Sequence, residues 1–215
     1  MTNLDNNWFP NQVFEDISIW ERFSQTLSHD NYKKILFEVE KYFISSDPTL
    51  DSISEFLKKR SEFFDLFLKV IWNKSLKSKR ISLIAVGGYG RGTLHPQSDL
   101  DLLILAEEIE IQTHSELIEE FLTQLWDANL IIGHSVRSIE QCIAFAKADI
   151  TINTNLLEHR LVAGNKKIYT DFLALLIFYE RIRLYHHASL WQVLSRNLYK
   201  SVYYPQSSDV LVNLY

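Results

Sequence analysis

The sequence predicts an α+β fold in which a small mixed or antiparallel β-sheet is flanked by N-terminal and C-terminal helices. Residues 81–86 and 100–105 are short apolar runs typical of strands, and the segment between them is too short for the helical crossover that parallel strands need. Residues 31–43 and 50–72 carry apolar side chains at helical spacing, and an aromatic-rich helical pattern covers residues 168–199.

Capping and turn residues assign the elements that follow the second strand. Residues 107–112 are expected to form a polar surface connection, and Thr113 with Glu116 fits a capping box that opens the next helix. Residues 130–137 have the pattern of a third strand, in which Gly133 marks either a bulge or a close approach of neighbouring chain.

A second capping box, formed by Ser138 and Gln141, opens another helix. Residues 149–153 are expected to be a short strand or a turn, and residues 156–162 a helix that ends with Gly164 at the C′ position. The predicted order is therefore helices, strand, turn, strand, helix, strand and helices.

The composition is that of an ordinary globular protein, with 47% hydrophobic and 23% charged residues among 215. A net charge of −5 argues against sequence-independent binding to nucleic acid, which requires a basic face. The single cysteine, Cys142, excludes an internal disulfide and is expected to be buried. The apolar run at residues 172–179 is far shorter than the roughly 20 residues that span a bilayer, so we expect a cytoplasmic protein without a membrane partner.

Glycines and acidic residues cluster between the first two strands. A strand that runs into Gly87 and Gly88 can turn with positive φ and bring backbone N–H groups close to an anion. Asp99 and Asp101 stand two residues apart at the start of the second strand, so their carboxylates share one face of the sheet. These charges repel each other unless a cation intervenes, and Mg²⁺ binds carboxylates together with substrate phosphates. The pattern predicts a phosphate-binding turn beside a divalent-metal site.

Other phosphate-binding motifs fit these glycines less well. A Walker A loop requires a lysine after the glycines, and none follows them. Gly88, Gly90 and Gly92 give G-x-G-x-G without the crossover helix of a dinucleotide fingerprint, although Glu107 and Glu108 fall near the expected distance. A glycine-rich turn beside a solvated acidic strand end is the remaining structural alternative.

The glycine and aspartate pattern is similar to the G-G/S…D-x-D signature of the polymerase β-like nucleotidyltransferase superfamily. Residues 85–105, 125–142 and 148–164 resemble, in this order, the N-terminal domain of the bacterial PII-protein uridylyltransferase/uridylyl-removing enzymes. Members of that family are longer and carry an HD phosphohydrolase domain and two ACT domains, so the removal of uridylyl groups is not carried over to this chain.

The resemblance implies three regions. Residues 1–72 would be an N-terminal helical region, residues 73–165 the nucleotidyltransferase core, and residues 166–215 a C-terminal helical segment. The implied fold is the small mixed sheet of the polymerase β-like nucleotidyltransferases.

The resemblance also implies a reaction, in which UMP is transferred from UTP to a tyrosine hydroxyl of the PII signalling protein and pyrophosphate is released. Asp99 and Asp101 would be the catalytic carboxylates and the ligands of Mg²⁺. Arg91 would either contact a phosphate or pair with an acid. The residues that would hold the phosphates are Gly87, Gly88, Ser98 and, in the first case, Arg91.

A third carboxylate from a later strand is usual in the superfamily. The matching place here holds Gly133, His134 and Ser135, so Asp149 and Glu158 are the remaining candidates. His134 is expected to have a structural or substrate-contacting role, because Mg²⁺ prefers oxygen ligands. Two other functions stay open: a nucleotide-binding or interaction module without catalysis, and a nucleotidyltransferase with a different acceptor.

Overall fold

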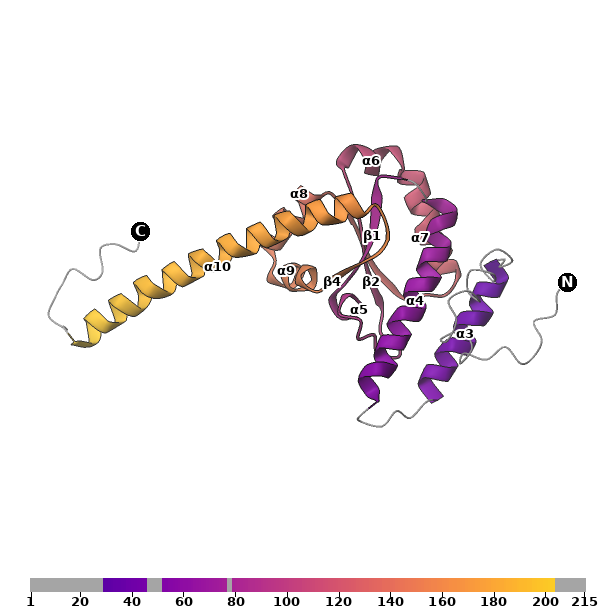
Figure 1. The fold of residues 1–215 in the computed structure, drawn as a ribbon, viewed down its shortest axis with the longest axis horizontal. Coiled ribbons are helices and arrows are strands. Elements are labelled where there is room, and N and C mark those ends of the chain that lie inside the picture. The colour runs from indigo at the N-terminus through magenta and orange to yellow at the C-terminus, as the bar shows by residue number, and fades with distance from the viewer. Residues whose placement is uncertain (1–28, 46–51, 77–78, 204–215) are drawn as a thin grey trace. The chain divides into compact units, whose positions relative to one another are not determined.

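The computed structural model describes residues 29–45, 52–76 and 79–203 and contains a four-stranded mixed sheet with strand order β3-β2-β1-β4 (Figure 1). β1 (Ile81–Val86) is antiparallel to β2 (Leu100–Ala106) and to β4 (His159–Gly164). β3 (Ile132–Arg137) is parallel to β2, and α6 (Glu108–Thr113) and α7 (Ser115–Asp127) form the crossover between them. The predicted α+β class and mixed sheet are confirmed.

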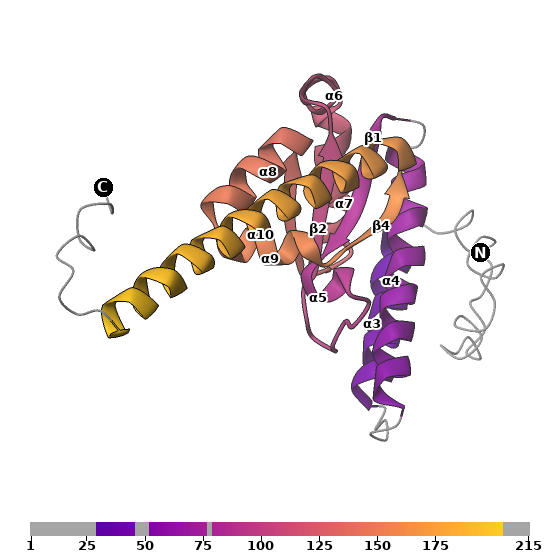
Figure 2. The ribbon, with the colours of Figure 1, turned by 60° about the vertical axis from the view of Figure 1, so that its left-hand side comes forward.

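Helices cover both faces of the sheet. α4 (Ile53–Ser75) and α7 lie on one face, where α3 (His29–Ser45) packs against α4, and α8 (Ile139–Ala148) and α9 (Ile150–Leu157) lie on the other face (Figure 2). Every second side chain of β1 and β2 points toward α4 and α7. The core on this face includes Phe63, Phe67, Ile71, Trp72, Leu83, Ala85, Leu102, Ile104, Phe121 and Leu125.

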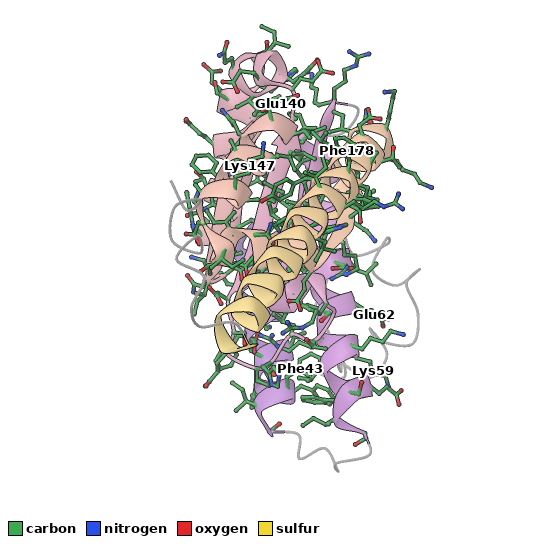
Figure 3. The ribbon with its side chains drawn as sticks, turned by 90° about the vertical axis from the view of Figure 1, so that its left-hand side faces the viewer. Phe43, Lys59, Glu62, Glu140, Lys147 and Phe178 are labelled. Carbon is green, nitrogen blue, oxygen red and sulfur yellow. The ribbon has the colours of Figure 1, made fainter. Side chains whose placement is uncertain are left out.

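α4 separates apolar from charged side chains. Figure 3 shows Lys59 and Glu62 pointing outward from α4. Phe43 of α3 is buried, and its ring lies edge-on to that of Phe56 at 5.0 Å between centroids. Arg60, next to Lys59 in sequence, is the exception, because it is only 2% exposed.

The buried Arg60 fixes the loop that leads to Asp99. Its guanidinium pairs with Glu40 of α3 and donates a hydrogen bond to the carbonyl of His95 (2.7 Å). The hydroxyl of Ser61 accepts a hydrogen bond from the backbone N–H of Leu94 (3.2 Å). α4 therefore anchors the loop between β1 and β2 at two successive residues.

The capping box predicted at Thr113 and Glu116 is wrong. Most of residues 107–112, predicted to be a surface connection, belong to α6 instead. Thr113 therefore ends a helix, and its hydroxyl donates to the carbonyl of Ile109 (2.6 Å). α7 begins after His114, whose side chain makes no capping hydrogen bond.

The capping box predicted at Ser138 and Gln141 is confirmed. The Ser138 hydroxyl accepts from the backbone N–H of Gln141 (3.2 Å), and the Gln141 side chain accepts from the backbone N–H of Ser138 (3.0 Å). Both bonds satisfy N–H groups that the first turn of a helix leaves without a partner in the helix itself.

Residues 149–164 fold differently from the prediction. Residues 150–157 are helical, and residues 159–164, predicted to complete a helix that ends at Gly164, form β4. Gly164 has a φ of 94°, and a Cβ there would collide with the carbonyl of Ile81, so this glycine allows close strand packing. A short apolar segment is compatible with either helix or strand by its own pattern. Hydrogen-bonded pairing with β1 stabilises residues 159–164 as a strand.

The chain divides into two compact units whose boundary falls between Thr170 and Asp171, inside α10 (Lys166–Tyr203). The boundaries expected at residues 72–73 and 165–166 stay a prediction. Residues 1–28 and 204–215, which belong to the predicted terminal regions, lie outside the described residues. Within the described ranges, no helix is both long and apolar enough to cross a membrane.

Cys142 of α8 offers a test of this packing. The residue is completely buried, and this burial raises the pKa of its thiol from the ordinary 9.0 to about 12. We expect iodoacetamide to leave the native protein unlabelled at about pH 8 and to label urea-unfolded protein fully, as read by mass spectrometry.

Because only the thiol of the unfolded protein ionises between pH 9.0 and about 12, the free energy of unfolding should fall as pH rises through that window. Fast labelling of native protein would contradict the packing.

Candidate functional site

The site begins at the glycine turn, which we define as residues 87–90, the single helical turn α5 (Gly87–Gly90) after β1. Gly87 has a φ of 59°, a left-handed conformation that residues with a Cβ rarely adopt. A Cβ on Gly90 would collide with the carbonyl of Glu158 and crowd that of Ala85, so the turn packs directly against neighbouring backbone. Gly88 is half-buried and leaves the outer side of the turn accessible.

The antiparallel pairing of β1 with β2 places Asp101 beside this turn. Ala85 pairs with Leu102, so the end of β1 lies next to the start of β2. The carboxylate oxygen Oδ2 of Asp101 lies 3.3 Å from the position that a Cβ of Gly87 would occupy. A glycine at position 87 therefore allows the left-handed turn and also leaves room for the Asp101 carboxylate.

Asp99 and Asp101 approach a common point on the neighbouring strand. Gly133 of β3 pairs with Asp101 in the parallel register. A Cβ on Gly133 would overlap Oδ1 of Asp101 and would lie 3.7 Å from Oδ2 of Asp99. The two carboxylates thus lie together, as their spacing predicts. Of the two alternatives predicted for Gly133, a bulge or a close approach, the structure shows the close approach.

The negative charge of Asp99 acts on the carboxyl group of Asp101. Asp101 is half-buried and Asp99 is exposed. Burial, and then the negative charge of Asp99, raise the pKa of the Asp101 carboxyl. Neither aspartate forms an ion pair with a basic side chain of the described residues. The arrangement therefore carries an electrostatic cost that a bound cation would relieve.

The residues present fit a magnesium ion. Mg²⁺ is usually held by one or two carboxylates together with substrate phosphates and water, and a pair of aspartates meets that requirement. No group of three or more His, Cys, Asp or Glu side chains suited to a metal occurs in the part of the chain that the structure describes.

The candidates for a third carboxylate make other contacts. Asp149 caps α9, and its Oδ1 accepts from the backbone N–H of Thr151 (2.7 Å). Glu158 forms an ion pair with Arg91. His134 is exposed on β3, with its ring edge-on to that of Trp126 at 5.5 Å. The structure groups none of these three with the aspartate pair.

Arg91 lies beside the glycine turn. Its Nη1 pairs with Glu158, which is one of the two contacts that the sequence leaves open. Its Nε donates to the hydroxyl of Thr93 (3.4 Å), and its Nη2 lies 3.7 Å from the position that a Cβ of Gly88 would occupy. The guanidinium therefore adjoins the accessible side of the turn while it is paired with an acid.

Ser98 is exposed and directly precedes Asp99. Its backbone N–H donates to the carbonyl of His95 (3.1 Å). Ser98 lines a cavity of about 300 Å³ that is formed by α3, α4 and the segments around Gln97 and Asn129. The phosphate contact of Ser98 stays a prediction.

Asn155 is a neighbour of the site that the sequence did not reveal. Its Oδ1 lies 3.5 Å from the position that a Cβ of Gly87 would occupy, the same position that Asp101 approaches. Thr154 was expected to be an N-cap before a helix over residues 156–162, so the pattern placed Asn155 at a helix start but did not show that it would face the glycines. The start of α9 at Asp149, visible as an N-cap residue, was the available signal.

Comparisons with known proteins agree with this geometry. Residues 69–157 match the family model described as a nucleotidyltransferase domain. Three similar proteins are named bifunctional uridylyltransferase/uridylyl-removing enzyme. They are 44% identical over 66% of this chain (Idiomarina loihiensis), 46% over 63% (Hydrogenovibrio crunogenus) and 44% over 65% (Haemophilus influenzae).

The aligned segments correspond to 15 to 16% of the length of these relatives. The matched domain spans the first three strands, the glycine turn, both aspartates and α9. Residues 69–157 are therefore a nucleotidyltransferase domain, the mixed sheet is consistent with a polymerase β-like fold, and the chain is similar to the uridylyltransferases.

Proposed function

We propose that this protein transfers UMP from UTP to a tyrosine hydroxyl of the PII signalling protein and releases pyrophosphate. The observation that carries the proposal is the approach of Asp99 and Asp101 to one point beside the glycine turn. Identities of 44 to 46% to proteins named for uridylyl transfer support UTP as the nucleotide. We propose the cytoplasm as the compartment, because UTP is made there.

Asp99 and Asp101 would hold Mg²⁺ in this reaction. When bound, Mg²⁺ would neutralise charge on the triphosphate and on the leaving pyrophosphate. Repulsion between the two carboxylates, which contributes to the raised pKa of Asp101, supports a cation at this place. The absence of a side chain at Gly133 leaves room for Oδ1 of Asp101, which a Cβ would overlap.

The other site residues would bind and orient the nucleotide. Gly87 and Gly88 would donate backbone N–H groups to the phosphates, and Arg91 would add a charged donor from the edge of the turn. Ser98 stays a predicted phosphate contact. Asn155 would offer an amide to the nucleotide next to Asp101. The tyrosine oxygen bonds to the α-phosphorus, the bond between that phosphorus and the bridging oxygen breaks, and the phenolic proton leaves to solvent.

The aspartate pair can be tested with Asp99→Asn and Asp101→Asn. We expect each to slow Mg²⁺-dependent transfer of radiolabelled UMP to PII by about 100-fold or more, because charge stabilisation of several kcal/mol is lost. Without Mg²⁺, the melting temperature should stay equal or rise, since one of two repelling charges is gone.

Asp149→Asn is the matched control for these variants, because asparagine also caps helices and the transfer rate should stay unchanged. Transfer at the wild-type rate in both site variants would refute the assignment of the aspartates. Binding of UTP without transfer to PII would identify a nucleotide-binding module, and labelling of another protein would identify a different acceptor.

Gly133→Ala tests the space in front of the carboxylates. The added Cβ would overlap Oδ1 of Asp101 and displace that carboxylate. We expect transfer to fall by about 100-fold, because a shift of about 1 Å in a reacting group is enough for such a loss. Urea unfolding should still be cooperative, and an unchanged transfer rate would show that the carboxylate position is unimportant.

Arg91 can be tested together with its partner. Arg91→Ala should raise the KM for UTP roughly tenfold, as expected for the loss of a charged hydrogen-bond donor to phosphate. Glu158→Gln should keep or lower the KM, because it releases the guanidinium. Arg183, which pairs with Glu180 in α10, supplies the control variant Arg183→Ala, with an unchanged KM expected. Equal KM values in Arg91→Ala and wild type would exclude the phosphate contact.

A further inference from the structure

The glycine turn is held from behind by a network of three polar side chains. Tyr89 lies between Gly88 and Gly90 and is 1% exposed. Its hydroxyl donates to Oδ1 of Asp65 in α4 (2.6 Å). Oδ2 of Asp65 forms an ion pair with Arg160 of β4. We call Asp65, Tyr89 and Arg160 the brace.

The brace contacts the backbone of the turn as well as a side chain. Nη2 of Arg160 donates to the carbonyl oxygen of Tyr89 (3.1 Å), and the guanidinium lies 5.2 Å from the centre of the Tyr89 ring. Tyr89 is thus fixed at its carbonyl by β4 and at its hydroxyl by α4. The orientation of the peptide groups in the turn therefore depends on residues distant in sequence.

Stability alone does not explain this network. Both charged side chains are largely shielded from solvent, with Asp65 14% and Arg160 31% exposed. Desolvating such a pair costs free energy, so apolar residues of similar volume often stabilise a fold equally well. Hydrogen bonds, in contrast to apolar contacts, fix the direction of the groups they join.

We propose that Asp65, Tyr89 and Arg160 are positioning residues that set the orientation of the glycine turn and thereby its affinity for the triphosphate of the nucleotide. The inference rests on the proposed function, because it takes the turn to be the phosphate site. The brace lies on the inner side of the turn, whereas Arg91 lies on the outer side beside Gly88. The brace acts on the nucleotide through the backbone of the glycine turn.

The test compares two buried tyrosines. Tyr89→Phe removes the hydroxyl that binds Asp65. Tyr32→Phe is the matched control, because Tyr32 is also 1% exposed and its hydroxyl accepts a hydrogen bond from Lys74 (2.6 Å), away from the turn. Both variants lose one hydrogen bond to a charged group, so both should unfold at a lower urea concentration.

The affinities for a non-hydrolysable UTP analogue with Mg²⁺, measured by calorimetry, should separate the two variants. We expect Tyr89→Phe to bind about tenfold more weakly and Tyr32→Phe to bind like wild type. In transfer assays, Tyr89→Phe should raise KM more than it lowers kcat, since the phosphate contacts exist before and during the reaction. Arg160→Lys, which keeps the charge, should retain more affinity than Arg160→Met.

Two failures are distinguishable. If the wild-type protein binds none of the four nucleoside triphosphates, the proposed function is wrong and this inference falls with it. If the wild type binds and Tyr89→Phe binds equally well while it unfolds more easily, the brace is merely structural and the inference alone is overturned.

Discussion

The antiparallel pairing of β1 with β2 is the constraint on which the site depends. An antiparallel pair brings the end of the first strand to the start of the second, so the glycine turn and Asp101 become neighbours. β3 then adds in parallel on the far side of β2 and presents Gly133 to the aspartates. A parallel arrangement of β1 and β2 would have placed the turn and the aspartates at opposite ends of the sheet.

The basic side chains around the turn pair with other acids and not with Asp99 or Asp101. Arg91 pairs with Glu158, and Arg160 pairs with Asp65, so the basic side chains next to the turn are neutralised by other acids. Asp99 and Asp101 retain their mutual repulsion, which contributes to the raised pKa of Asp101. Such a repelling pair carries an electrostatic cost, and perturbed pKa values of this kind are common at functional sites.

α4 supports both halves of the site. Arg60 and Ser61 hold the loop that leads to Asp99, and Asp65, one helical turn further along, holds Tyr89 of the glycine turn. All three residues precede the segment matched by the nucleotidyltransferase family model, which begins at residue 69. The part of α4 before residue 69 therefore contributes directly to the geometry of the matched domain.

The sequence by itself determined the features that depend on neighbouring residues. The short connection required an antiparallel first pair of strands, the two-residue spacing directed both aspartates to one face, and Ser138 with Gln141 marked a helix start. In each case the backbone period or a local hydrogen bond decides the structure, so the information lies within a few residues.

The tertiary structure alone decided the rest. Residues 159–164 become β4 because the edge of β1 is available for pairing. Asn155 lies at the site because α9 packs beside the glycine turn. The acidic partners of Arg60, Arg91 and Arg160 lie between 20 and 95 residues away in sequence. An arginine on a helix or strand has the same local pattern whether it faces solvent or a buried acid. Whether the arginine faces solvent or an acid is determined by long-range packing, which the local sequence pattern does not encode.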